Sequence, residues 1–573
     1  MSYRPEWVDA LRRKYYSRSI CQFILHGNVN DFVRVSENEQ GEYLKLNQYL
    51  MYELFKKRDI VICYDRANGI SFSQPEMKKD FLNSLTAYDT LHGTNFAKAL
   101  PKDPIRAFAI LENYIRIRLN DKKRISLIIE YAETLAPAST MAYSNAEDRA
   151  IQVYLLRWAK DALFIESDFT LVMVTENIEE MNHAIVRNPY TAEIEIAYPD
   201  ETERLRFIYF MTRKYSKIIE LLEMTPEILA KHTAGVNLVH LKTLLLEILE
   251  NNIRFTNADL MKKKQEIIEA EANGLLEFVK TKYNLDYVAG HKYAKQHLRE
   301  AAMAIKNGRN DVLPMGYLVN GPVGTGKTFL VSCFAAEIGI PMVLLKNFRS
   351  QWQGVTEANL ERVLRILKAM NPVAVMIDEA DAYLGNRNAQ GDSGVSSRVF
   401  SMIASFMSNT EHRGKIIWFL LTARPDLMPV DLKRQGRAEE HIALFYPETI
   451  EEKKELFEVM LKKVGIQEVT VNDFEDEFYQ NLKILSGADM EAALTRAKFK
   501  AASIGKNIVT KEIIKQVMDD FIPPTYPEEI ELMNYVAVLE CTSKELLPEK
   551  FRSIPRDELL NKIEELKKFK VRN

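Results

Sequence analysis

The chain has 573 residues, which is enough for about three to five domains at roughly 100–200 residues each. Hydrophobic residues make up 47%, charged residues 27%, and the formal net charge is −3. This composition excludes intrinsic disorder as the main state, and the balanced charge does not indicate nucleic-acid binding. Glycine is scarce, at 22 residues, and this predicts a helix-rich protein with few long loops.

The cysteines and the apolar runs exclude further classes. The cysteines are Cys21, Cys63, Cys333 and Cys541, and none forms a C-x-x-C pair, so we expect reduced thiols rather than a zinc site or disulfides. The N-terminal residues contain no apolar segment of the signal-peptide type. The longest apolar run, Ile416–Leu421, has the length of a strand. We therefore expect a cytoplasmic protein without a membrane span.

Two parts of the chain resemble each other at a nearly constant spacing. The matched pairs are Glu130 and Asp378, Thr175 and Thr422, Tyr198 and Tyr446, and Gly235 and Gly487, at spacings of 248, 247, 248 and 252 residues. A unit of this size is too long for a solenoid repeat. The sequence therefore predicts two copies of one domain of roughly 220–250 residues each.

In the first copy, a strand-like run leads into Phe23–Asp31 (FILHGNVND). This segment has one glycine and no lysine, and we expect the charge of Asp31 to repel phosphate. Tyr131 follows Glu130 where the second copy has a second carboxylate. A helical pattern covers Glu201–Asn251. We interpret residues 1–255 as a degenerate α/β domain with a helical lid that binds no ATP in the usual manner, and residues 256–284 as a helical linker.

In the second copy, short apolar runs alternate with helical patterns. The runs are Tyr317–Asn320, Met342–Leu345, Val373–Ile377 and Ile416–Leu421, and Ala358–Met370 has the spacing of an amphipathic helix. Such alternation predicts a parallel sheet covered by helices. We therefore expect an α/β domain over 285–445, a helical lid over 446–522 and a C-terminal helical appendage over 523–573.

A complete phosphate-binding motif, G-x-x-x-x-G-K-[ST], stands in the second copy. It consists of Gly321, Pro322, Val323, Gly324, Thr325, Gly326, Lys327 and Thr328. It follows a predicted strand and opens a predicted helix, which is the context that supports the motif. Backbone N–H groups of such a loop surround phosphate oxygens, the lysine contacts the β- and γ-phosphates, and the hydroxyl binds Mg²⁺. The fold class predicted is therefore α/β, a P-loop NTPase parallel sheet with a helical lid, present twice in tandem with the first copy degenerate.

Two carboxylates end the predicted strand Val373–Ile377, 50 residues after Thr328. We expect Asp378 to hold Mg²⁺ together with Thr328. We expect Glu379 to polarise the attacking water as a general base.

These motifs together resemble the AAA family of ATPases. The likeness extends over the acidic strand end IDEADAYL, the Gly/Ser-rich segment that begins at Asp392, the segment from Ala423 to Arg437, and Ser486–Asp489 in the lid. It is strong over roughly 285–520 and weaker over about 20–255. The resemblance implies ATP and Mg²⁺ as ligands and a homo-oligomeric ring, with six subunits usual for the family.

The resemblance also assigns roles to single residues. Arg434 and Arg437 match arginine fingers, which act on ATP held by the neighbouring subunit. Val288, Ala289 and Gly290 match the segment that cups adenine. The residues that match the substrate pore loop are Trp352, Gln353 and Gly354.

One position departs from the family pattern. The sensor asparagine, which orients the attacking water, falls on Ala423. Thr422 is the neighbouring residue that could replace it; otherwise hydrolysis is slow.

The first functional hypothesis is a ring-forming, Mg²⁺-dependent ATPase that remodels or threads a protein substrate, whose identity the sequence does not give. The alternative is an ATP-controlled interaction scaffold with slow or absent hydrolysis, in which the first copy binds a partner. A nucleic-acid motor or loader is a weaker third hypothesis, because nothing in the charge balance favours nucleic acid.

Overall fold

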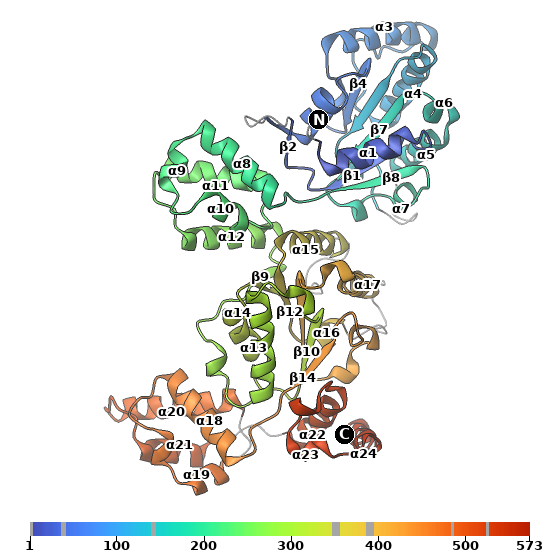
Figure 1. Cartoon of the computed structure of the whole chain (residues 1–573). Coiled ribbons are helices and arrows are strands. Elements are labelled where there is room, and N and C mark those ends of the chain that lie inside the picture. Colours follow the sequence, from blue (N-terminus) through green and yellow to red (C-terminus); the bar gives the residue numbers. More distant parts are fainter. Residues whose placement is uncertain are drawn as a thin grey trace. The chain divides into compact units, whose positions relative to one another are not determined.

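The computed structural model describes residues 4–35, 42–138, 145–346, 356–384, 395–482, 486–522 and 526–572. The chain divides into two compact units. The first consists of residues 1–272 together with 357–370, and the second of residues 273–356 and 371–573. Figure 1 shows the elements of both units, coloured along the sequence.

The first unit contains a six-stranded sheet among its described residues, in the order β5-β4-β6-β7-β1-β8. Its strands are β1 (Gln22–Gly27), β4 (Ile60–Asp65), β5 (Gly69–Phe72), β6 (Ile125–Ile129), β7 (Phe169–Val174) and β8 (Thr191–Ile196). All neighbouring pairs are parallel except β4 and β5, which are antiparallel. The parallel strands therefore end at one edge of the sheet.

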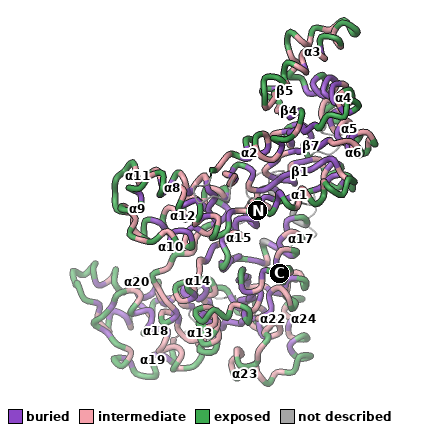
Figure 2. Tube along the Cα trace, turned by 45° about the horizontal axis from the view of Figure 1, so that its top comes forward, coloured by how far each residue is buried: buried purple, intermediate pink, exposed green. Residues whose placement is uncertain are grey.

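Helices cover both faces of this sheet, so β1, β6 and most of β7 are buried, and most of their residues are apolar (Figure 2). Successive residues of β1 enter different cores: Ile24 packs with Phe108 and Trp158, whereas Phe23 packs with Trp7. The covering helices are α1 (Glu6–Tyr16), α2 (Leu46–Tyr49), α3 (Pro75–His92), α4 (Pro104–Asn120), α5 (Ala146–Lys160), α6 (Ala162–Glu166) and α7 (His183–Val186).

A helical bundle and a short hairpin complete the first unit. The bundle consists of α8 (Glu201–Lys214), α9 (Lys217–Leu221), α10 (Pro226–His232), α11 (Leu238–Asn251) and α12 (Asn257–Glu271), and the hairpin of β2 (Phe32–Arg34) and β3 (Tyr43–Lys45). Leu260 of α12 is fully buried in the core of the bundle. Much of the segment expected as a linker, 256–284, is thus a structural part of this bundle.

The second unit repeats the strand order of the first among its described residues: β14-β10-β13-β12-β11-β9. Its strands are β9 (Leu276–Phe278), β10 (Gly316–Asn320), β11 (Met342–Leu345), β12 (Val373–Ile377), β13 (Ile416–Thr422) and β14 (Glu440–Ala443). The predicted strands of the second copy are all present. The antiparallel edge strand has a different origin in each unit, because β9 precedes the other strands whereas β5 forms a hairpin with β4.

The helices of the second unit form three groups. Those near the sheet are α13 (Lys292–Lys306), α14 (Lys327–Ile338), α16 (Ala380–Leu384) and α17 (Val395–Met407). The bundle consists of α18 (Ile450–Val464), α19 (Asp476–Asn481), α20 (Gly487–Ser503) and α21 (Lys511–Asp520), and the C-terminal group of α22 (Pro527–Glu540), α23 (Glu549–Arg552) and α24 (Arg556–Arg572).

Helix α15 (Thr356–Met370) connects β11 to β12, yet its residues 357–370 group with the first unit. The equivalent connection of the first unit, from β4 to β6, contains α3 and α4, which pack in the core of their own sheet. The pattern of Ala358–Met370 predicts this helix correctly, but not the neighbours against which it packs.

The structure refines one matched pair of the repeat. Helix α11 of the first bundle and α20 of the second begin after caps at Asn237 and Ser486, 249 residues apart. Gly235 and Gly487 are therefore not equivalent, because Gly235 lies before its cap and Gly487 after its own. In the described ranges, no helix is both long and apolar enough to cross a membrane.

Candidate nucleotide-binding site

The phosphate loop leaves β10, a central strand of the second unit's sheet. Gly321 has φ 134°, and an added Cβ would lie 2.1 Å from the carbonyl oxygen of Leu444, so only glycine fits. Gly324 and Gly326 have φ values of 85° and 86°, and Gly326 caps the N-terminus of α14. The loop thus passes directly into a helix N-terminus, the usual place of a bound phosphate.

The amino group of Lys327 lies over the loop itself. It donates to the carbonyl oxygens of Gly321, at 2.8 Å, and Pro322, at 2.9 Å. Burial lowers the pKa of Lys327 to about 8, while the nearby carboxylates of Asp378 and Asp381 oppose this change. The lysine is therefore a cation held close to its titration point, which an arriving phosphate would stabilise.

The Thr328 hydroxyl and the Asp378 carboxylate meet in front of the loop. The Thr328 Oγ1 donates to Asp378 Oδ2 at 2.8 Å, although 50 residues separate them in the chain. Oxygen ligands of this kind are the ones that Mg²⁺ prefers, so the residues present fit the ion that the fold implies. Glu379 follows with φ 49° and is exposed. Its left-handed backbone turns the chain immediately after the strand.

Thr422, at the end of β13, is buried and already engaged. Its hydroxyl donates to Asp381 Oδ1 at 2.6 Å and accepts from the backbone N–H of Arg424 at 2.9 Å. On the neighbouring strand, the side-chain amide of Asn320 is buried and forms no hydrogen bond among the described residues. Asp381 and Asn320 are polar groups of this edge that the sequence analysis did not select.

The two candidate finger arginines differ in their surroundings. Arg434 is exposed, and its guanidinium forms no hydrogen bond or ion pair within the described part of the chain. Arg437 donates to the carbonyl oxygen of Asp431 at 2.7 Å, and burial lowers its pKa, with the charge of Arg434 acting in the same direction. A free arginine beside an anchored one is a suitable arrangement for reaching another subunit.

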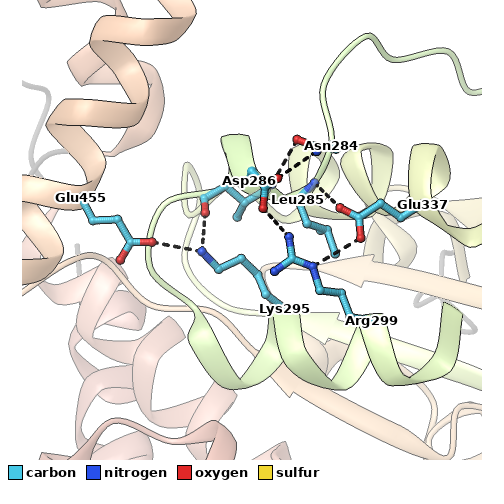
Figure 3. A network of polar contacts seen from close by, with 8 residues as sticks. Asn284, Leu285, Asp286, Lys295, Arg299, Glu337 and Glu455 are labelled. Atoms are coloured by element: carbon cyan, nitrogen blue, oxygen red, sulfur yellow. Dashed lines mark hydrogen bonds and ion pairs between the residues drawn. The ribbon is translucent and has the colours of Figure 1, made fainter. Parts of the chain in front are cut away.

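The expected adenine segment lies where the sheet's core meets the core of the bundle. Val288 is buried in the first of these cores, and Ala289 packs against the second. Lys295 of α13 ties the two together, since its Nζ donates to Val288 O at 2.7 Å and to Glu455 of α18 at 3.0 Å (Figure 3). Gly290 has φ 65° and ends the segment.

The network around Lys295 continues along α13. Arg299 contacts the carboxylates of Asp286 and Glu337, and Glu337 also accepts from the backbone N–H of Leu285 at 2.9 Å (Figure 3). No motif marks these residues, because the pattern of α13 shows only that one face is apolar.

The bundle approaches the loop at a second place. An added Cβ on Gly324 would lie 2.9 Å from Cβ of Ser486, which caps α20. The Tyr446 hydroxyl also donates to the carbonyl oxygen of Val323. The lid motif Ser486–Asp489 therefore lies next to the phosphate loop, and Val323 is an exposed residue at its tip.

The first unit has the same opening geometry and a different continuation. Gly27 ends β1 with φ 99°, and an added Cβ would lie 2.6 Å from the carbonyl oxygen of Ile196. Tyr131 has φ 53°, which matches Glu379. Asp31 follows where the second unit has its phosphate loop. Its carboxylate accepts hydrogen bonds from the backbone N–H groups of Leu238 and Val239, at 3.0 and 2.9 Å.

Several expected residues lie outside the described residues, namely Trp352, Gln353 and Gly354 and the start of the segment from Asp392, residues 392–394. Their proposed roles therefore remain predictions from the sequence. Within the described ranges, no group of three or more His, Cys, Asp or Glu residues is arranged to hold a metal ion. The Mg²⁺ assignment accordingly relies on Thr328 and Asp378 acting together with phosphate oxygens.

A phosphate loop follows a parallel strand, and its Thr328 is hydrogen-bonded to the Asp-Glu pair that ends another strand of the same sheet. These features define the second unit as a P-loop nucleotide-binding domain. Comparison with family models agrees. Residues 317–446 match the AAA model, described as "ATPase family associated with various cellular activities". Residues 2–197 match the N-terminal Rossmann-like domain of AAA+ chaperones, and residues 202–273 their second helical domain. The chain belongs to the AAA family.

The curated relatives have low sequence identity to this chain, but two of them align over most of its length. The cell division cycle protein 48 homolog of Archaeoglobus fulgidus is 25% identical over 453 residues, which is 71% of this chain and 60% of that protein. The AAA domain-containing protein ycf46 of Gracilaria tenuistipitata is 23% identical over 87% of this chain and 93% of its own length. The ATP-dependent zinc metalloprotease FtsH of Parabacteroides distasonis is 29% identical over 41% of this chain and 35% of its own.

Proposed function

We propose that the chain binds ATP with Mg²⁺ at the phosphate loop of the second unit and hydrolyses it to drive rearrangement of a protein partner. The observation that carries this proposal is the convergence of Lys327, Thr328 and Asp378, two of them joined by a 2.8 Å hydrogen bond. Two of the family models that match the chain describe domains of AAA+ chaperones, and one relative is an ATP-dependent zinc metalloprotease. These descriptions support a protein substrate.

Each residue of the site has a task in this proposal. Lys327 exchanges the carbonyl oxygens of its own loop for phosphate oxygens, and the glycine-rich backbone surrounds them. Thr328 and Asp378 would hold Mg²⁺, which when bound neutralises phosphate charge. Glu379 accepts the proton of the attacking water. Thr422 and Asp381 form a hydrogen-bonded pair at the same edge that orients this water.

The assembly belongs to the proposal as well. Arg434 is exposed and forms no ion pair with any described residue, so we infer that it reaches the ATP of a neighbouring subunit in a homo-oligomeric ring, which would be a hexamer as is usual in the family. Arg437 fixes the turn that presents it. The hydrogen bond from Arg437 to Asp431 O within its own subunit supports this division of roles.

The proposal is tested by nucleotide binding and turnover of the full chain. Lys327→Ala is expected to lose ATP binding, while the exposed Lys415→Ala serves as the matched control. Glu379→Gln is expected to bind ATP without turnover. Parental turnover in Lys327→Ala would contradict the proposal.

A mixing experiment tests the arginine in trans. Arg434→Ala and Glu379→Gln chains should each be inactive alone. Mixed together, they should regain part of the turnover, because a Glu379→Gln subunit can supply its arginine to an intact Arg434→Ala site. No recovery in a mixture that demonstrably assembles would argue against the arginine in trans.

One observation favours the slower scaffold alternative. The Thr422 hydroxyl is committed to Asp381 and to the Arg424 N–H, and Ala423 has no polar side chain. Ala423→Asn should therefore raise turnover several-fold if water orientation limits the rate. An unchanged rate would mean that Thr422 and Asp381 suffice.

A further inference from the structure

Helix α15 lies between the sheet and the bundle of the first unit. On the sheet side its residues contact the carboxyl ends of β1, β7 and β8. On the bundle side Met370, the last residue of α15, lies against Gly235, whose added Cβ would come 2.5 Å from Met370 Cγ. We name this region, defined by His26, Glu176, Asn177, Glu193 and Gly235, the seam of the first unit.

Buried polar contacts fix the middle of α15 in the seam. Arg365 is 9% exposed, and its two terminal nitrogens donate to Glu361 at 2.8 Å and to the side-chain oxygen of Asn177 at 2.7 Å. Glu361 lies 3.8 Å from the His26 ring, whose other nitrogen is 3.2 Å from Glu193. A buried guanidinium with both partners in place is costly to separate from them.

Charge complementarity extends along the helix. Arg362 forms an ion pair of 2.5 Å with Glu176, directly after β7, and Lys368 lies 3.4 Å from Glu195 in β8. Three cationic side chains of α15 thus meet the Glu176 carboxylate and the Asn177 amide of the seam and the nearby Glu195 carboxylate. Arg362 and Arg365 on the polar face of this helix are thus matched to partners in the first unit, whereas Lys368 remains exposed.

The seam is the counterpart of the ATP site. In the second unit, Tyr446 and the cap Ser486 both lie at the phosphate loop. Their equivalents, Tyr198 and Asn237, instead donate to Glu271 of α12, at 2.7 and 3.2 Å. The first unit thus uses this edge to hold a helix of its own chain.

The same helix is joined covalently to the catalytic strand. Only Asn371 and Pro372 separate Met370 from β12, which ends at Asp378 and Glu379. A movement of α15 is therefore transmitted to the strand that carries both carboxylates. The seam and the ATP site share one mechanical element.

We propose that the first unit regulates ATP turnover by holding α15, with Arg362 and Arg365 as positioning residues for the site at Asp378 and Glu379. This inference rests on the proposed ATPase function. It assigns the first unit a part in the cycle that needs no nucleotide of its own. Coupling of this kind typically changes rates by about 2- to 30-fold.

The test is a charge swap in the full chain. Arg362→Glu and Glu176→Arg should each change turnover at saturating ATP by at least about threefold, and the double variant should return towards the parent. The affinity for ATP should change less than the rate. The matched control is the surface pair Arg66 and Glu147, also in the first unit, whose swap should change nothing.

Hydrogen exchange gives a second measurement that needs no turnover. ATP should alter the exchange of α15 and of residues 171–198 in the parent, and not in Lys327→Ala. If the parent binds ATP without hydrolysing it, the ATPase proposal fails while this measurement still decides the coupling. The inference would be overturned if all swap variants hydrolysed ATP at the parental rate and if ATP left the amide hydrogen exchange of α15 unchanged.

Discussion

The ends of β1 and β10 start alike and continue differently. Each strand leads into a glycine of positive φ, Gly27 in the first unit and Gly321 in the second. Each glycine lies close to a backbone carbonyl oxygen at the end of the neighbouring edge strand, that of Ile196 after β1 and that of Leu444 after β10. Beyond this glycine, the second unit has a loop for phosphate, whereas the first has Asp31 bound to the N-terminal amides of α11. A carboxylate of the chain itself thus accepts hydrogen bonds from helix N-terminal amides, which would otherwise attract an anion.

The comparison separates architecture from chemistry. The glycine, the left-handed residue after the acidic strand and the strand order are common to both units, so they serve the fold. The side chains of Lys327, Thr328 and Glu379 have no chemical equivalent in the first unit, where Tyr131 stands in the place of Glu379, and this agrees with the nucleotide role proposed for them. Substitutions in each class should therefore have different consequences.

The largest effect is expected at the shared glycines. Gly321→Ala and Gly27→Ala each place a methyl group against a backbone carbonyl, which should destabilise the affected unit by roughly 3 kcal/mol or more. Gly339→Ala is the matched control: its φ is 75°, but nothing lies within 4 Å, so we expect only about 1 kcal/mol. Urea unfolding of the full chain measures the difference. Equal losses at Gly339 and Gly321 would show that conformational strain, not the carbonyl, sets the requirement.

Asp31 is expected to come next. Asp31→Ala leaves two buried amides of α11 without an acceptor and should cost about 1–3 kcal/mol of the first unit's stability. Asp31→Asn retains an acceptor and should cost much less. Urea midpoints of the transition that reports the first unit give both values.

The pH dependence of Asp31 sharpens this prediction. Burial raises the pKa of Asp31 to about 6, above the value near 4 expected in the unfolded chain. The folded state therefore holds the proton more tightly, so this residue favours folding below pH 4 and loses that contribution as pH rises towards 6. The stability of Asp31→Asn relative to the parent should increase over that range. If the parent instead became more stable relative to Asp31→Asn as the pH rises, the raised pKa of Asp31 would be wrong.

A further effect of about tenfold is expected in ATP affinity. The pKa of Lys327 is lowered to about 8, and bound phosphate should raise it, so binding takes up a proton when the free lysine is neutral. The dissociation constant for ATP should be nearly constant below pH 7 and increase roughly tenfold between pH 7 and pH 9. Titrations with a fluorescent ATP analogue measure it, and Lys327→Arg should remove the dependence. A flat profile in the parent would place the lysine's pKa well above 9.

Much of this comparison could be predicted from the sequence. The strands of the second copy and the amphipathic helix over 358–370 follow from apolar spacing, and the phosphate loop follows from its motif and context. The spacing near 248 residues also indicates the tandem architecture, although Gly235 and Gly487, 252 residues apart, are not equivalent in the structure. Cap residues align the two bundles better than glycines, because a cap is fixed by the first turn of its helix.

The remaining features depend on contacts between distant parts of the chain. The pattern of α15 predicts a buried face and cannot say that its polar face meets the seam of another domain. From the sequence, Asp31 is expected only to repel phosphate. Its actual partner, the backbone amide of Leu238, is 207 residues away in the chain and cannot be foreseen. Lys295 belongs to no motif, and Asp381 lies in the acidic segment IDEADAYL without an assigned role, so only the structure shows their contacts with Val288 and Thr422.

The smallest effect concerns how each unit joins its bundle to its sheet. The first unit uses Asp31 on α11, and the second uses Lys295 between Val288 O and Glu455. Lys295→Met should remove both bonds of the lysine while keeping much of its apolar stem. Because this partly exposed pair is worth less than about 1 kcal/mol, ATP affinity should fall by about two- to fivefold.

A competition experiment can show which part of the ligand is affected. Since Lys295 supports the adenine segment and not the phosphate loop, Lys295→Met should weaken ATP more than inorganic triphosphate. Arg309→Ala, which removes an exposed ion pair with Asp311, is the matched control and should change neither. Equal weakening of both ligands would mean that the Lys295–Glu455 contact holds the whole bundle over the site.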